Sequence, residues 1–151
     1  MDLVQLVYFS HIPAGGAPVD IAGILRSARR HNARQHITGM LNFRDDFFLQ
    51  LLEGERDAVN ETYSRIIRDP RHWNVVLIGY QPAVQRIFPA WSMHWVADVG
   101  DIREVIMRYS ASDHFRPDKM SFDCAIAFMQ GFAAWGQRRS ADAGAQLAAG
   151  M

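Results

Sequence analysis

The sequence has little of three features that would point to particular classes of protein. Its 151 residues include a single cysteine, Cys124, which excludes an internal disulfide and suits a reducing compartment. The 16 basic and 16 acidic residues cancel, so no bulk charge favours nucleic acid or an anionic membrane. No apolar run approaches the roughly 20 residues of a membrane span. We therefore expect a soluble protein that binds neither nucleic acid nor a membrane.

Two further patterns are missing. The N-terminus starts with the strand-like residues 3–9 and lacks the basic start, apolar stretch and cleavage site of a secretory signal peptide, which favours a cytoplasmic location. The six histidines show no paired spacing typical of a zinc site, so we expect no metal. What remains is a chain long enough to bury one core without disulfide or metal, with a helical appendage.

The periodicity of the apolar residues predicts an α+β fold. Apolar runs indicate five strands, and apolar residues at helical spacing indicate two helices between them. The order strand-helix-strand-strand-helix-strand is that of the ferredoxin-like βαββαβ sandwich, here with one added strand that gives a five-stranded mixed sheet. The predicted strands are 3–9, 37–43, 47–52, 75–78 and 91–96, and the predicted helices begin after Asp20 and near Val59.

Both faces of the first strand are largely apolar, so both faces of the sheet need a cover. The two helices should cover one face. Residues 101–135 can cover the other, because Phe122, Ile126 and Met129 mark the buried stripe of a longer helix. We therefore divide the chain into a domain at 1–98, a C-terminal helical extension at 99–135, and a tail at 136–151 whose composition predicts disorder.

The most informative residue is Gln50, which lies within the apolar run from Phe47 to Leu52. Such a run is typical of a strand that is covered on both faces. The amide carries donors and an acceptor that water cannot reach there, and leaving them unpaired would cost roughly 1 to 3 kcal/mol. The amide therefore has a partner, which is either a protein group or a bound ligand.

Two other polar side chains point to the same region. Asn32 lies within about 20° of the apolar stripe of the first helix, although it could simply close that helix at its C-terminus. Tyr8 lies on one side of the first strand, where a lone tyrosine is most often part of the core. Together with Gln50 they would form the floor of a slot with Ile24 and Ile66 as apolar walls, as expected for a planar polar ligand.

These residues belong to a longer ordered pattern. Its members are Tyr8 and Ser10; Ile21, Ile24, Leu25, Ala28, Arg29 and Asn32; Ile37, Thr38, Gly39 and Leu41; Phe48, Gln50, Leu52, Glu53 and Gly54; Val59 to Asp69; Arg71 and His72; and Arg86, Phe88, Trp91 and Met93. No single piece is specific, but the ordered set closely resembles the BLUF family of blue-light sensors that use FAD. The resemblance is to the short, single-domain members.

The resemblance implies roles for the residues of the slot. A tyrosine at the position of Tyr8 donates an electron and a proton to photoexcited flavin. A glutamine at Gln50 bridges that hydroxyl to the N5/C4=O edge of the flavin, and light rearranges its hydrogen bonds and shifts the absorption to the red. An asparagine at Asn32 holds the C4=O/N3 edge. Trp91 and Met93 match the candidates for relaying the change outward.

The remaining contacts to the FAD cofactor are implied by position alone. Ile24 and Ile66 match the residues that sandwich the ring. Arg65 and Asp69 match those that border its pyrimidine side. Arg30 and His31 match those that approach the ribityl and diphosphate groups. His31 departs from relatives that carry an asparagine there. For Arg30, a solvated basic helix face is an alternative interpretation.

The resemblance implies a photoreceptor without a catalytic output of its own. It would signal through its last strand and C-terminal helices to a downstream protein, and the apolar C-terminal helices favour a homo-oligomer. The alternative is an acylphosphatase-like small enzyme on the same fold, which needs an anion-binding loop and a reactive arginine near the first strand. Residues 1–25 contain no arginine, which argues against this enzyme. A flavin-free oligomerisation module is a third interpretation.

Overall fold

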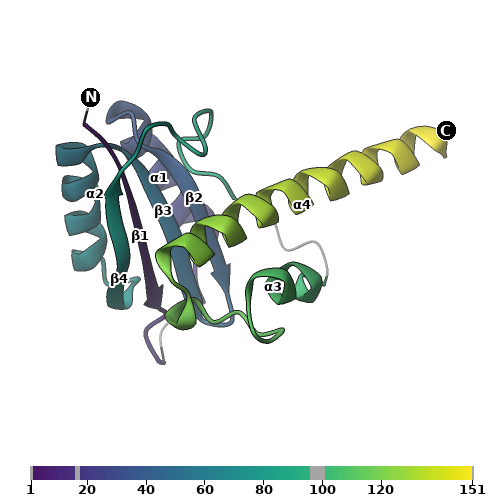
Figure 1. Cartoon of the computed structure of the whole chain (residues 1–151), viewed down its shortest axis with the longest axis horizontal. Helices are drawn as coiled ribbons and strands as arrows, with labels where there is room; N and C mark the ends of the chain where they lie inside the picture. Colours follow the sequence, from purple (N-terminus) through teal and green to yellow (C-terminus); the bar gives the residue numbers. More distant parts are fainter. Residues whose placement is uncertain (1, 16–17, 96–100, 151) are drawn as a thin grey trace.

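The computed structural model describes residues 2–15, 18–95 and 101–150. Four strands form one sheet in the order β2-β3-β1-β4, and all three ladders are antiparallel. This is the ferredoxin-like arrangement that the sequence predicts. The strands are β1 Leu3–His11, β2 Thr38–Arg44, β3 Phe47–Glu55 and β4 Trp73–Pro82; the helices are α1 Ile21–Arg34, α2 Arg56–Arg68, α3 Arg103–Tyr109, the 3-10 turn η1 Pro117–Lys119 and α4 Phe122–Ala149 (Figure 1).

The fifth strand of the predicted mixed sheet is not confirmed, because the described residues form a four-stranded antiparallel sheet. Within the described residues of the segment 91–96, only an isolated parallel bridge joins Met40 to His94, on the outer edge of β2. A regular strand would place the side chains of Trp91 and Met93 on the same face of the sheet. The structure packs them into different clusters on opposite faces, and this requires a bent backbone. Residue 96 lies outside the described residues.

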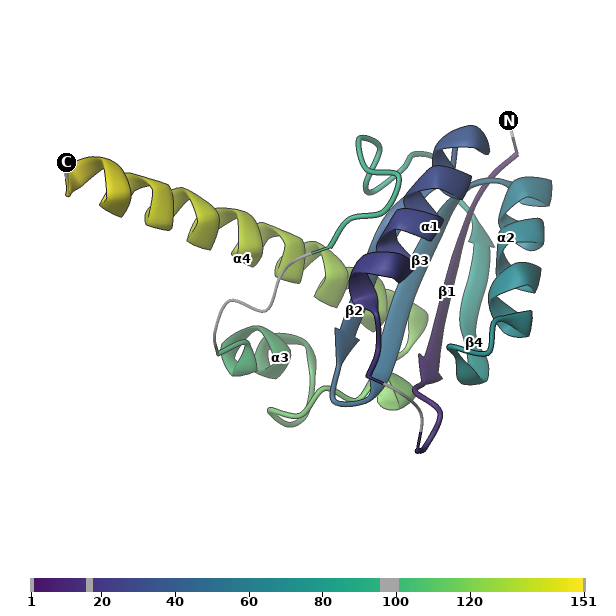
Figure 2. The same ribbon diagram turned by 180° about the vertical axis from the view of Figure 1, so that it is seen from behind.

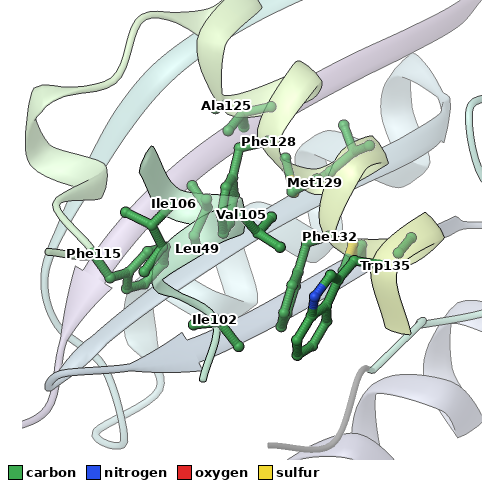
Figure 3. Close-up of a cluster of buried hydrophobic side chains, with 14 of the residues drawn as sticks. Leu49, Ile102, Val105, Ile106, Phe115, Ala125, Phe128, Met129, Phe132 and Trp135 are labelled. Carbon is green, nitrogen blue, oxygen red and sulfur yellow. The ribbon is translucent and has the colours of Figure 1, made fainter. Parts of the chain in front are cut away.

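The two faces of the sheet are covered by different pairs of helices. On one face, α1 and α2 pack on alternate residues of the strands, such as Leu6 and Leu52 (Figure 2). On the other face, α3 and α4 pack on the intervening residues, such as Val7 and Leu51. The prediction that the C-terminal helices cover the second face is therefore confirmed. Aromatic and aliphatic side chains fill this second cluster, among them Leu49, Ile102, Val105, Phe115, Phe128, Phe132 and Trp135 (Figure 3).

Helix α4 extends beyond the point where the sequence predicts it to end. The composition predicts disorder over 136–151, whereas α4 continues to Ala149 and projects away from the sheet (Figure 1); residue 151 lies outside the described residues. The physical reason is composition, because alanine has the highest helix propensity of all residues. Residues 137–150 are all exposed. No helix in the described part of the chain is long and apolar enough to cross a membrane.

Candidate functional site

A pocket opens between α1 and α2 above the helix-covered face of the sheet. Its empty volume is about 610 Å³, including solvent-filled space. Of the residues that the sequence predicts for cofactor binding, the structure brings together Ile24, His31, Asn32, Gln50, Arg65, Ile66 and Asp69. Sequence reasoning assigned no role to the other lining residues, which are Ser27, Ala28, Leu41, Thr62, Arg71 and His72.

Gln50 lines the pocket and forms a buried polar pair with Tyr8, which does not itself line the pocket. The register of β1 on β3 places Tyr8 directly opposite Gln50, and the Tyr8 hydroxyl donates a hydrogen bond to Gln50 Oε1. The Gln50 Nε2 donates to the sulfur of Met93 over 3.3 Å. Burial raises the pKa of Tyr8 well above its usual value, and the neighbouring Tyr63 and Asp69 raise it further. The phenol is therefore protonated at neutral pH and able to donate.

Asn32 lies in the last turn of α1 and is 1% exposed. Its Nδ2 donates to the backbone oxygen of Ser92 over 2.9 Å, so its partner is the segment that follows β4. Arg29 Nε donates to the backbone oxygen of Met93 over 3.1 Å. Helix α1 therefore holds the bent segment in place with two side chains. The Oδ1 of Asn32 has no hydrogen-bond partner among the described residues, and this leaves an acceptor for a ligand.

His31 connects the two helices at the mouth of the pocket. Its Nε2 lies 3.1 Å from Thr62 Oγ1, and the Thr62 hydroxyl donates to the backbone oxygen of Ala58 over 2.8 Å. Because that hydroxyl already donates, it accepts from His31, and the proton of the neutral ring is on Nε2. Burial lowers the pKa of His31, and the nearby Arg65 lowers it further. The ring is therefore uncharged at neutral pH.

Arg30 does not line this pocket. It lines an adjoining polar depression together with Arg34, and this depression shares His31 and Arg65 with the pocket. Its position follows from the helical period, because Arg30 is off the apolar stripe of α1. The depression carries three guanidinium groups against the single acidic side chain of Glu61, so its local charge suits an anion.

Asp69 and Arg71 form a rigid turn at the other end of the pocket. Asp69 accepts hydrogen bonds from the backbone nitrogen of Arg71 and from its guanidinium, at 2.5 to 3.0 Å. Burial alone would raise the pKa of Asp69, but these hydrogen bonds outweigh it and leave the pKa below its usual value. The carboxylate is therefore charged and fixed in orientation at neutral pH.

The two predicted relay residues lie on different faces of the sheet. Met93 is 2% exposed and packs in the cluster under α1 and α2. The ring of Trp91 stacks on His94, with centroids 3.6 Å apart, and borders a groove between residues 87–91 and α4. The sequence could not assign either residue to a face. The structure places Met93 against Gln50 and places Trp91 against the C-terminal helix.

A buried carboxyl group fastens the segment that carries these two residues, and sequence reasoning gave it no role. Glu53 is fully buried on β3 and accepts from the backbone nitrogens of Ile87 at 2.7 Å and Phe88 at 2.9 Å. Its third donor is the amide of Gln5, at 2.9 Å. The guanidinium of Arg86 adds bonds to Thr38 and to the backbone of β3. The sequence did contain a signal for this role, because Glu53 directly follows the apolar run that contains Gln50, and a buried carboxyl group, like a buried amide, needs hydrogen-bond partners.

The structure is that of a small α+β domain with a pocket between two helices, and the pocket is lined by Gln50 of a buried tyrosine–glutamine pair. Residues 3–94 match the family described as "Sensors of blue-light using FAD". The chain belongs to this family.

Among the described residues, no group of three or more His, Cys, Asp or Glu side chains could hold a metal ion.

Similar proteins agree on the family and differ in what else they contain. The chain is 39% identical over 92 residues to photoactivated adenylate cyclase subunit beta of Euglena gracilis, and this match covers 60% of the chain but 11% of the cyclase. It is 40% identical over 83 residues to the blue light- and temperature-regulated antirepressor BluF of Escherichia coli (strain K12), covering 54% of the chain and 21% of BluF. The chain thus spans a small part of the length of these relatives.

Several solved structures match most of the chain, and two of them are of BlrB and BlsA. One is the dark-state structure of BlrB, a BLUF protein, with a TM-score of 0.70 and 30% identity over 88% of this chain and 96% of that one. The other is the photo-activated state of BlsA, with a TM-score of 0.76 and 27% identity over 83% of this chain and 91% of that one. The likeness therefore includes parts of the chain beyond residue 94, where the family match ends.

The pocket residues fit FAD, the cofactor of this family. Ile24 and Ile66 offer apolar walls for a flat ring, and Gln50 and the free Oδ1 of Asn32 offer polar contacts for its edges. The adjoining basic depression around Arg30 suits the charge of a diphosphate. An apolar slot that continues into a cationic depression matches a cofactor with a neutral ring at one end and phosphates at the other.

Proposed function

We propose that this protein is a blue-light photoreceptor whose response to light begins at Tyr8 and Gln50. The observation that carries the proposal is the hydrogen bond from the buried Tyr8 hydroxyl to Gln50, which lines the pocket. When bound, the flavin supplies the absorption of blue light and accepts an electron. A phenol is oxidisable, and an amide can exchange its donor and acceptor ends in place. The pair therefore combines an electron source with a reversible hydrogen-bond network.

In this mechanism Tyr8 would lose an electron to the bound flavin, and its hydroxyl proton would follow by way of Gln50, which would accept a proton at Oε1 and release one from Nε2. The amide of Gln50 would then tautomerise or rotate, because the Tyr8 oxygen no longer donates to it, and the electron and proton would return to Tyr8 in the dark. Rotation would take Nε2 away from the sulfur of Met93. Each exchanged hydrogen bond is worth roughly 1 kcal/mol or more in a dry site. Several such exchanges are enough to bias a neighbouring segment between two arrangements.

The other pocket residues would hold the cofactor. Ile24 and Ile66 would sandwich the ring, Asn32 would bind the C4=O/N3 edge, and Arg65 and Asp69 would border the pyrimidine side. The alternative that Asn32 only closes α1 is not supported, because its side chain bonds Ser92 rather than the helix end. Arg30 and His31 would meet the ribityl and diphosphate part, at the junction of the pocket and the basic depression.

The output would leave through the segment that follows β4. Met93 contacts Gln50 on one face, while Trp91 borders the groove against α4 on the other. A change at Gln50 would therefore reach the C-terminal extension through a few residues of one chain segment. We propose that residues 1–98 sense light, and that residues 99–135, with the continuation of α4, carry the signal to a separate downstream protein in the cytoplasm or to a second copy of the chain.

The test is the visible spectrum of the purified protein before and after blue light. The protein should carry flavin, and blue light should produce a small red shift that reverses in the dark. Tyr8→Phe should remove the shift and leave flavin bound. A protein that takes up no flavin on refolding would overturn the proposal, and a normal shift in Tyr8→Phe would overturn the role of the tyrosine. The family match does not favour the acylphosphatase-like alternative.

A further inference from the structure

A serine and a histidine meet at the inner wall of the pocket. Ser10 lies on β1, two residues beyond Tyr8 on the same face, and is fully buried. His72 immediately precedes β4 and lines the pocket. The Oγ of Ser10 and the Nδ1 of His72 are 2.7 Å apart, which is a short hydrogen bond.

The imidazole of His72 has little freedom to turn. Its ring centroid lies 6.1 Å from that of Tyr8 in an edge-on contact and 4.6 Å from that of Phe48. Its backbone nitrogen donates to the backbone oxygen of Asp69 over 3.1 Å. Burial lowers the pKa of His72 to about 4. At neutral pH the ring is therefore uncharged, and only one of its two nitrogens carries a proton.

The serine decides which nitrogen that is. Among the described residues, the Ser10 hydroxyl has no hydrogen-bond partner other than His72. If Nδ1 carried the proton, it would donate to Oγ and leave a buried O–H group without an acceptor, which is unfavourable. If the hydroxyl donates to Nδ1, every polar hydrogen of the pair is satisfied. The proton of the ring then belongs on Nε2.

The Nε2 atom is in a position to meet a ligand. It has no hydrogen-bond partner in the described part of the chain, and it is not among the polar atoms that are both buried and unpartnered. Since His72 lines the pocket, the open Nε2 is accessible to a molecule bound there. An uncharged N–H group at this place would bind an acceptor, such as a carbonyl oxygen or an unprotonated ring nitrogen.

We infer that Ser10 is a positioning residue that fixes His72 as the Nε2–H tautomer, so that His72 donates a hydrogen bond to the acceptor edge of the pocket ligand beside Tyr8 and Gln50. That this ligand is a flavin rests on the proposed function, whereas the tautomer itself does not. His72 would thus supply a fixed hydrogen-bond donor to the pocket, while Gln50 would supply a reversible one.

The test is nitrogen NMR of the flavin-free protein with labelled histidine. The His72 signals are identified by their loss in His72→Gln. In the parent protein at pH 7, Nε2 should show the shift of a protonated nitrogen and Nδ1 that of an unprotonated one. Ser10→Ala should produce a mixture of tautomers, and Ser10→Thr, which keeps the hydroxyl, should restore the single tautomer. Ser27→Ala is the matched control, because Ser27 lines the same pocket but does not bond His72.

A proton on Nδ1 in the parent protein would overturn the inference. An unchanged tautomer in Ser10→Ala would overturn the role of the serine. A second measurement is FAD affinity, which Ser10→Ala should weaken about fivefold and Ser10→Thr should largely keep, since one neutral hydrogen bond contributes roughly that factor. If no variant binds FAD, the proposed function fails, but the NMR result still decides the tautomer.

Discussion

Two buried glutamines on neighbouring strands show how the faces of the sheet differ. Gln5 faces α3 and α4, and its amide donates to the side chain of Glu53, which also receives two backbone N–H groups. Gln50 faces α1 and α2, and its amide contacts the Tyr8 hydroxyl and the sulfur of Met93. A carboxylate oxygen is a strong acceptor, and a thioether sulfur is a weak one.

The amide nitrogen of Gln5 is held by a strong acceptor, whereas that of Gln50 is held by a weak one. Gln5 gives up a strong hydrogen bond if it moves, so it acts as part of the framework. Gln50 has only a weak contact at its nitrogen, and its oxygen is held by the Tyr8 hydroxyl alone, so the state of Tyr8 decides whether its amide stays in place. The packing around the two glutamines differs in the same way. The α3/α4 face is filled with packed rings, whereas the α1/α2 face leaves an open pocket.

The comparison is tested most severely by replacing each glutamine with leucine. Gln50→Leu should abolish the light-induced red shift completely while flavin remains bound, because no amide is left to exchange partners. Gln5→Leu is the matched control on the other face and should keep the full shift. Difference spectra recorded after blue light measure both. A full red shift in Gln50→Leu would show that Gln50 is not the residue whose hydrogen bonds change on illumination.

The side chains packed between α3, α4 and the sheet should contribute strongly to the free energy of unfolding. Phe128→Ala removes a fully buried ring from the α3/α4 cluster and should lower the free energy of unfolding by about 3 to 5 kcal/mol. Urea unfolding of the flavin-free protein measures this loss. Leu147→Ala on the same helix is the control, because Leu147 is 75% exposed and its loss should change stability by less than about 0.5 kcal/mol. Equal losses would mean that the projecting half of α4 is also packed.

The pocket face should respond to pH through His72. Burial holds the pKa of His72 at about 4 in the folded protein, below the ordinary value of 6.5. Between these values the unfolded chain binds more protons than the folded one, so stability is full above pH 6.5 and falls as pH decreases toward 4. With partial exposure taken into account, the loss is on the order of 2 kcal/mol.

Urea unfolding at a series of pH values measures this effect. His72→Gln should flatten the slope between pH 6.5 and 4, because it removes the group whose protonation favours unfolding. Asp69 titrates below this window, since its pKa lies under the usual value for a carboxyl. A slope that persists unchanged in His72→Gln would assign the effect to other histidines, such as His31.

The smallest effect should come from Trp91. Its ring stacks on His94 and Phe88 on the side away from the pocket, so Trp91→Phe should leave the dark flavin spectrum unchanged and keep FAD affinity within about twofold. Absorption spectra and a flavin titration check this. A clear change in the dark spectrum would show that Trp91 contacts the flavin, contrary to the division of the two residues between the faces.

Much of the fold and of the pocket was predictable from local patterns. Alternation along the strands puts Tyr8 and Gln50 on the same face, and the helical period directs Ile24 and Asn32 inward and Arg30 outward. These relations depend only on the period of each element. The structure accordingly places Ile24, Asn32 and Gln50 in the lining of the pocket, with Tyr8 bonded to Gln50.

The rest depends on contacts between distant segments. The opposite placement of Trp91 and Met93 follows from a bend that α1 and Glu53 impose, and no pattern within residues 91–96 encodes that bend. Ser10 pairs with His72, which lies 62 positions further along the chain, and this pairing requires the turn at Asp69. The continuation of α4 was obscured because a composition rich in alanine, glycine and serine was interpreted as disorder, although alanine itself favours helix.

The projecting half of α4 has a mechanical consequence. Residues 137–149 rise about 1.5 Å each and form a rod of about 20 Å whose residues are all exposed. The base of this rod borders the groove that Trp91 helps to line. A tilt of about 5° at that base would swing the tip by nearly 2 Å, by simple leverage over the length of the rod. The helix is thus a lever arm that would enlarge a small local movement into one that a neighbouring molecule can detect.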